Sequence, residues 1–172
     1  MINFRPTDYP KIYLSGGWEN IANDPEFLFS QNIKAVLDLQ YTVNDAASLP
    51  MTVRDALSEW DIEYTYYPFE DTENYSASAL EESLSNMSLV LNEWEEKYPR
   101  RNQHILIKCG AGVSRSPTAY LYYMCNRYGG SYLSRLWELR WEEEGWTQFG
   151  SSPNVAFHSF LKKKFPDENY DE

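Results

Sequence analysis

The fold predicted for this chain rests on one stretch, Ile105-Leu106-Ile107-Lys108-Cys109-Gly110-Ala111-Gly112-Val113-Ser114-Arg115-Ser116-Pro117. Its first three residues are apolar, with a β-branched isoleucine at each end, which is typical of a buried strand. Pro117 and the residues Thr118–Met124 predict a helix with proline in its first turn, where the missing N–H loses no hydrogen bond. The sequence therefore predicts a buried strand, a short loop of small residues, and a helix.

The loop between this strand and this helix has the features of an anion site. N–H groups at a helix amino terminus have no intrahelical acceptor, and they carry the positive end of the helix dipole. The glycines let the backbone approach an anion closely because they have no Cβ, and the arginine guanidinium can hold two phosphate oxygens at once. We call residues 110–115 the anion loop. Its predicted phosphate-binding residues are Gly110, Ala111, Gly112, Val113, Ser114 and Arg115.

Cys109, at the mouth of the anion loop, predicts nucleophilic chemistry. The thiolate is the nucleophilic form of cysteine, and a helix amino terminus with nearby cations favours it over the thiol. Ser116 follows the arginine and can hydrogen-bond the sulfur, which helps the sulfur to leave again. The pattern predicts covalent phosphoryl transfer through Cys109, with Arg115 stabilising the transferred group.

This segment resembles the signature loop of the cysteine-dependent phosphatases, in which five residues separate a cysteine from an arginine. The form Ala111–Ser116 is similar to that of the dual-specificity branch, as are the strand 35–39 and the Pro-Asn-x-x-Phe start of a closing helix at Pro153. The resemblance implies a protein phosphatase that hydrolyses phosphotyrosine and/or phosphoserine/threonine through a phosphocysteine intermediate, with no cofactor. The family usually has a histidine directly before the cysteine, where this chain has Lys108.

The leaving oxygen of a phosphate ester needs a proton, which a carboxylic acid on a facing loop can supply. Asp71 follows a predicted strand and precedes the helix that leads back to Cys109. The dual-specificity pattern has its general-acid aspartate at this place, so the resemblance implies that role for Asp71. Glu70 and Glu73 are the alternatives.

Strands and helices are expected to alternate along the chain. Predicted strands, marked by short apolar or alternating runs, cover residues 12–14, 33–39, 62–67 and 105–107. Predicted helices, marked by helical periodicity, lie in part of 18–29, at 53–60 after a loop over 40–52, and over 78–98, 117–128, 131–144 and 153–165. This order indicates an α/β fold with a mostly parallel central sheet flanked by helices on both faces. We expect a single domain over residues 1–166, an irregular segment over 1–11 and a disordered acidic tail over 167–172.

Two of these helices carry more specific predictions. Ser78 and Glu81 form a capping-box pattern at the start of the long helix. The predicted inward face of the helix 131–144 consists of Leu133, Leu136, Trp137 and Arg140 or Trp141. Its predicted solvated acidic face consists of Glu138, Glu142, Glu143 and Glu144.

The composition is that of a packed protein, because 42% of the 172 residues are hydrophobic and 16% are aromatic. A nucleophilic thiol favours a reducing compartment, so we expect a cytoplasmic protein, with the nucleus as an alternative. The first residues have no secretory-signal pattern, and no apolar run approaches about 18 residues, so we expect no membrane partner. The net charge of −11 also disfavours nucleic acids and anionic membranes.

The remaining candidate residues are predicted to have no catalytic or metal-binding role. His104 and His158 are too few and too far apart to indicate a metal site, and we expect none. Cys125 is predicted to fill the core, and Arg54 to be a solvated cation.

Two classes of function fit these residues. The first is the phosphoprotein phosphatase described above. The second is a catalytically weak or inactive phosphatase-like module that binds phosphorylated partners, and Lys108 is the feature in its favour. Phosphoinositide-directed and RNA-directed relatives usually carry basic residues inside the loop, and residues 110–114 have none, which favours phosphorylated peptides as substrates. The sequence favours neither phosphotyrosine nor phosphoserine/threonine as the substrate, and it indicates no particular oligomeric state.

Overall fold

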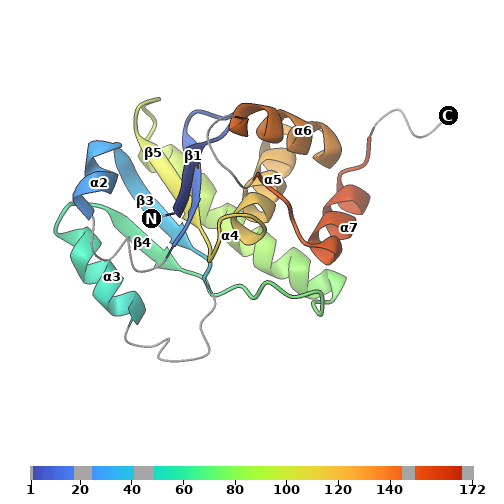
Figure 1. The fold of residues 1–172 in the computed structure, drawn as a ribbon, viewed down its shortest axis with the longest axis horizontal. Helices are drawn as coiled ribbons and strands as arrows, with labels where there is room; N and C mark the ends of the chain where they lie inside the picture. The colour runs from blue at the N-terminus through green and yellow to red at the C-terminus, as the bar shows by residue number, and fades with distance from the viewer. Residues whose placement is uncertain (1, 18–24, 41–48, 145–149, 168–172) are drawn as a thin grey trace.

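The computed structural model describes residues 2–17, 25–40, 49–144 and 150–167. Its centre is a five-stranded sheet with the order β1-β2-β5-β3-β4 (Figure 1). Neighbouring strands are parallel except for the antiparallel pair of β1 and β2, so the prediction of a mostly parallel sheet is confirmed. The strands are β1 (Ile2–Pro6), β2 (Ile12–Gly16), β3 (Ile33–Asp38), β4 (Glu63–Tyr66) and β5 (His104–Lys108).

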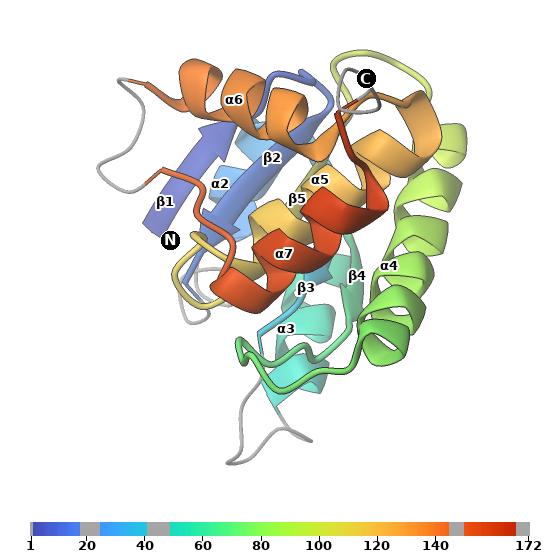
Figure 2. The same cartoon turned by 90° about the vertical axis from the view of Figure 1, so that its right-hand side faces the viewer.

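Helices cover both faces of the sheet, as predicted (Figures 1 and 2). One face carries α2 (Pro25–Ser30) and α3 (Leu49–Ser58), and the other carries α4 (Ala77–Lys97), α5 (Arg115–Tyr128), α6 (Tyr132–Glu143) and α7 (Val155–Lys164). Successive residues of a strand point to opposite faces, so Leu106 of β5 packs with α2 and α3 while Ile105 and Ile107 pack with the larger helical layer. This is why the middle residues of β3 and β5 are apolar on both faces of the sheet.

The topology places the segment after β5 at the centre of one sheet edge. β5 lies between β2 and β3, and Lys108 at its end is in register with Ser15 and Asp38. The carboxyl ends of parallel strands meet at this edge, which is where open α/β sheets bind ligands. The anion loop leaves β5 there and leads directly into α5.

The starts of two helices differ from the prediction. Ser76, not Ser78, caps α4: its backbone is extended and its side chain accepts a hydrogen bond from the N–H of Ala79. Ser78 already lies inside the helix, so the predicted capping box is wrong by two residues. α3 begins at Leu49, so residues 49–52 are helical and not loop, because a proline at position 50 suits the first turn of a helix.

Residues 2–6 form the strand β1, so the prediction of an irregular segment over 1–11 is wrong there. The inward-facing side chain of this strand is Arg5, which is fully buried, and a register shift separates Ile2 from Arg5. Ile2 and Phe4 alternate with polar residues, but two apolar residues beside Pro6 are too few to indicate a strand, and the buried side chain is a charged one.

The face of α6 also differs from the prediction. Its buried residues are Tyr132, Leu136, Leu139 and Glu143, so Leu136 is the one predicted inward residue that is fully buried. Trp137 and Trp141 are each 65% exposed and stack on each other, with ring centroids 5.5 Å apart. Glu143 is 2% exposed and is not part of a solvated face. Both stripes have helical spacing, and the buried one includes a charge that Arg5 neutralises.

Some predictions fall outside the described residues, namely the first part of the helix in 18–29, positions 41–48 of the predicted loop, and the tail 168–172. Within the described residues, no helix is both long and apolar enough to cross a membrane. Arg54 is exposed, as predicted, and its guanidinium lies over the ring of Tyr64.

Candidate active site

Cys109 is the first residue after β5 and lies at the floor of the site. It is 2% exposed, and its N–H donates to the carbonyl of Ser15 at 3.1 Å. Ser116, in the first turn of α5, is fully buried, and its hydroxyl oxygen lies 3.4 Å from the Cys109 sulfur. The predicted contact between Ser116 and the sulfur is therefore present.

The carbonyl groups of residues 110–113 in the anion loop point away from its centre. Each accepts a hydrogen bond from a donor outside the loop: Gly110 from the N–H of Gly17 (2.9 Å), Ala111 from Asn3 Nδ2 (3.3 Å), Gly112 from Arg5 Nη2 (2.8 Å), and Val113 from the N–H of Ser152 (2.7 Å). In a trans peptide the carbonyl and the following N–H point in opposite directions, so the N–H groups face inward. Among the described residues, none of the N–H groups of 110–114 has a protein acceptor.

Close packing against β2 requires glycine at two positions of this site. Gly112 has φ +76°, and a Cβ there would lie 2.7 Å from the backbone of Ser15 and Gly16. A Cβ on Gly16 would lie 2.4 Å from the carbonyl carbon of Ala111. Gly16, the last residue of β2, is therefore part of the support of the anion loop.

The amino terminus of α5 faces the loop without a side-chain cap. Ser114 occupies the N-cap position, but its hydroxyl donates to Asp71 Oδ1 at 3.0 Å. The free N–H groups and the helix dipole are thus directed at the site. Arg115 extends across the loop, where its Nη1 donates to the carbonyl of Phe69 at 2.9 Å and its Nη2 lies 2.8 Å from the place of a Cβ on Gly110.

Asp71 lies at the rim of the site and is exposed. Its Oδ1 accepts hydrogen bonds from the hydroxyl of Ser114 and from Asn154 Nδ2, at 3.0 and 2.9 Å. The ring of Phe69, two residues earlier, stacks on Phe157 of α7, with centroids 5.1 Å apart. These contacts fix the segment before α4 against the anion loop and the start of α7.

A cavity of about 260 Å³ brings the main predicted residues together. Glu70 and Glu73, the alternatives to Asp71, do not line it. Gly110, Gly112 and Ser116 are also absent from the described residues that line it. The described residues that line it are Asp71, Cys109, Ala111, Val113, Ser114, Arg115, Ser152 and Asn154.

Comparison with known proteins gives a clear result for the fold. No family model matches the sequence, and no curated protein matches it. A PTP-2 phosphatase of Cydia pomonella superposes with a TM-score of 0.72 over 95% of this chain and 91% of that chain, at 21% identity. DUSP15 superposes with 0.66 over 93% and 85%, at 17% identity. A human tyrosine phosphatase-like serine/threonine/tyrosine-interacting protein superposes with 0.60 over 91% and 92%, at 13% identity.

The chain has the fold of the dual-specificity phosphatases. In this phosphatase fold the cavity of Cys109 lies where β5 runs into α5, as the resemblance of the signature loop implied.

Lys108 lies beneath the anion loop of this phosphatase fold and is fully buried. Its Nζ lies 3.0 Å from both Asp38 Oδ1 and Gln40 Oε1, and the hydroxyl of Tyr64 donates to Asp38 Oδ2 at 2.6 Å. Burial lowers the pKa of Lys108, while the carboxylate of Asp38 acts in the opposite direction. Burial, together with Asp38, raises the pKa of Tyr64. Lys108 thus forms a buried ion pair with β3 in the position where the family usually has histidine.

Cys125 packs in the core, which confirms the prediction for this residue. Burial raises the pKa of its thiol to about 11, so it stays protonated at neutral pH. Both cysteines are free thiols. Within the described residues, no group of three or more histidine, cysteine, aspartate or glutamate side chains could hold a metal ion.

Several supporting residues of the site were absent from the sequence prediction. Asn154 was assigned only to the start of the closing helix, but its side chain also contacts Asp71 and the carbonyl of Thr72. Its position beside the predicted general acid depends on packing between segments far apart in the sequence. Other missed residues, which hold the anion loop from outside, are Asn3, Arg5, Gly16 and Ser152.

Proposed function

We propose that this protein is a protein phosphatase of the dual-specificity type, which acts on phosphotyrosine and/or phosphoserine/threonine. One observation carries the proposal: Cys109, Arg115 and Asp71 line a single cavity at an uncapped helix amino terminus. The fold shared with solved phosphatases supports the reaction class.

In the first step the Cys109 thiolate attacks phosphorus, and the bond from phosphorus to the leaving oxygen breaks. The inward N–H groups of the anion loop and the guanidinium of Arg115 stabilise the charge on the equatorial oxygens. Asp71, at the rim and opposite the buried sulfur, donates a proton to the leaving oxygen. The products of this step are the free alcohol or phenol and a phosphocysteine.

In the second step water attacks phosphorus, and Asp71 accepts its proton. The bond from phosphorus to sulfur breaks, and inorganic phosphate and the Cys109 thiolate are released. The hydroxyl of Ser116, 3.4 Å from the sulfur, donates a hydrogen bond to the thiolate as it leaves. The reaction needs neither a metal ion nor an organic cofactor.

The charges around the cavity support a phosphorylated protein as the substrate. Residues 110–114 contain no cation, and Glu70 and Glu73 are exposed beside Asp71. A net charge of −11 opposes the approach of nucleic acids and anionic membranes. We further propose that the protein acts in the cytoplasm, where thiols remain reduced.

The test is the turnover of phosphopeptides, phosphoinositides and triphosphate-ended RNA by the wild type and by Cys109→Ser. We expect turnover of phosphopeptides by the wild type alone, while Cys109→Ser still binds tungstate, a tetrahedral mimic of phosphate. Phosphatase activity retained by Cys109→Ser would exclude the phosphocysteine mechanism.

Lys108 favours a second candidate, a phosphatase-like module that binds phosphorylated partners and turns them over weakly or not at all. A lysine paired with Asp38 cannot offer the two ring nitrogens with which histidine orients a loop. Undetectable hydrolysis of an aryl phosphate across the pH range, together with micromolar phosphopeptide binding, would establish this module instead.

A further inference from the structure

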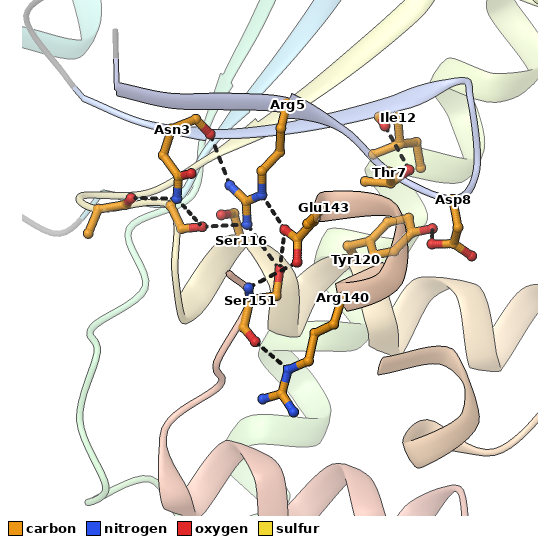
Figure 3. Close-up of polar contacts among 12 residues, drawn as sticks. Asn3, Arg5, Thr7, Asp8, Ile12, Ser116, Tyr120, Arg140, Glu143 and Ser151 are labelled. Atoms are coloured by element: carbon orange, nitrogen blue, oxygen red, sulfur yellow. Dashed lines mark hydrogen bonds and ion pairs between the residues drawn. The ribbon is translucent and has the colours of Figure 1, made fainter. Parts of the chain in front are cut away.

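Arg5 and Glu143 form an ion pair in the interior, between β1 and the last turn of α6 (Figure 3). Arg5 is 0% exposed and Glu143 is 2% exposed, and Arg5 Nε donates to Glu143 Oε2. The two residues are 138 positions apart in the sequence. Burial of two charges is unusual in so small a protein, so the pair calls for a physical explanation.

The guanidinium of Arg5 uses its donors in a fixed pattern. Besides the bond to Glu143, Nη1 donates to the carbonyl of Asn3 at 2.9 Å, and Nη2 donates to Ser151 Oγ at 3.0 Å and to the carbonyl of Gly112 at 2.8 Å. Glu143 accepts from the N–H and the hydroxyl of Ser151, at 3.0 and 2.7 Å. The planar fork is therefore held in one orientation, with one arm directed at the anion loop (Figure 3).

Stability alone does not account for this arrangement. The attraction within a buried ion pair only partly offsets the loss of hydration, and apolar residues of similar volume are often as stabilising or more so. Apolar residues cannot supply the donor that holds the Gly112 carbonyl at 2.8 Å, and the other donor to this carbonyl, Asn3 Nδ2, is longer, at 3.4 Å. With the Gly112 carbonyl held outward, the planar peptide directs the N–H of Val113 into the cavity.

We propose that Arg5, oriented by Glu143, is a positioning residue for the anion loop: it fixes the peptide between Gly112 and Val113 so that its N–H faces the bound oxyanion. The inference deepens the proposed function, since it rests on oxyanion binding by this loop. It does not depend on turnover, because a loop that binds phosphate without hydrolysing it needs the same orientation.

The experiment compares Arg5→Met, Arg5→Met/Glu143→Gln and Arg5→Lys with the wild type. Arg5→Met leaves Glu143 as an unpaired buried charge and is expected to lower the thermal midpoint strongly. The double variant has no buried charge at this place and keeps an oxygen acceptor for Ser151. It should therefore recover most of the fall in the thermal midpoint. Arg5→Lys keeps the charge beside Glu143, but its ammonium lacks the fork that reaches Glu143 and Gly112 together.

Two readouts report on the loop itself: the affinity for tungstate, and the pH profile of Cys109 alkylation by iodoacetamide. In the double variant and in Arg5→Lys we expect tungstate affinity to fall about tenfold or more, as for one lost hydrogen bond to a charged group. The alkylation profile of both variants should also differ from that of the wild type, because the backbone of the loop that follows Cys109 has moved. The matched control is Tyr123→Phe, which removes a buried hydrogen bond to Glu95 and should lower stability without changing either readout.

Wild-type tungstate affinity and an unchanged alkylation profile in the double variant or in Arg5→Lys would overturn the inference. An absence of tungstate binding by the wild type would overturn it as well. A wild type that binds tungstate but hydrolyses no phosphoester refutes the proposed phosphatase alone, and the positioning role is then decided by the variants.

Discussion

Replacing Asp38 by asparagine tests whether Lys108 is charged beneath the anion loop. Both side chains of this ion pair are fully buried, and Lys108 Nζ lies 3.0 Å from Asp38 Oδ1. The variant keeps the size of the side chain and an oxygen acceptor for the hydroxyl of Tyr64, but it removes the carboxylate charge that faces the ammonium of Lys108. Removing one partner of a buried ion pair costs about 3–5 kcal/mol. For a chain of this length that corresponds to a fall of about 6–20 °C in the thermal midpoint.

The pKa of Lys108 determines the direction in which the free energy of unfolding changes with pH. Burial lowers the pKa of Lys108 in the folded state, so between that pKa and the ordinary value of 10.5 the unfolded chain binds more protons. The free energy of unfolding therefore rises with pH across that window. Asp38 opposes the lowering, so its loss lowers the Lys108 pKa further and extends the window downward. The stability deficit of Asp38→Asn relative to the wild type should be largest at low pH and shrink as the pH rises towards 10.

Urea denaturation of the wild type, Asp38→Asn and Asp38→Asn/Lys108→Met, between about pH 6 and 10, measures both effects. The double variant also lacks the ammonium of Lys108. It should therefore recover part of the lost free energy of unfolding and should not show the added pH dependence of Asp38→Asn. The control is Lys97→Met, which breaks an exposed pair with Glu63 and should cost less than about 1 kcal/mol. A loss below about 1 kcal/mol in Asp38→Asn, independent of pH, would refute a charged Lys108 held by Asp38.

Three further predictions concern the cavity. Asp71→Asn should lower kcat by about 10²–10⁴ for phosphoesters with poor leaving groups and much less for p-nitrophenyl phosphate, and an equal loss on both would contradict its role as acid. Gly112→Ala should abolish tungstate binding because its Cβ meets the backbone of β2, whereas Gly129→Ala, with φ +80° and open space, should cost about 1–2 kcal/mol and leave binding intact. Iodoacetamide at pH 8 should add one label to the wild type and none to Cys109→Ser, since burial raises the pKa of Cys125 to about 11, and a second label seen by mass spectrometry would contradict this.

The strand, loop and helix around Cys109 could be predicted because their signals are local. The apolar run of β5, the glycines and the proline in the first turn of α5 each report on backbone within a few residues. Alternation of strands and helices then indicates a parallel sheet, and its carboxyl edge contains the loop. The choice of Asp71 over Glu70 depended on the family resemblance, because carboxylates in one loop look alike without the contacts to Ser114 and Asn154.

The errors arose where the tertiary structure reverses a local preference. On α6 two stripes have helical spacing, and periodicity favoured the one with Trp137 and Trp141 over the one with Glu143. A charged glutamate is seldom buried without a counter-charge, and the partner here, Arg5, lies in a strand of five residues that is too short for a clear alternating pattern. Glu143 was predicted to be solvated and Arg5 to lie in an irregular segment, and both predictions failed together. The same pair holds the Gly112 carbonyl, so the part of the site that local patterns missed is the part that orients the anion loop from outside.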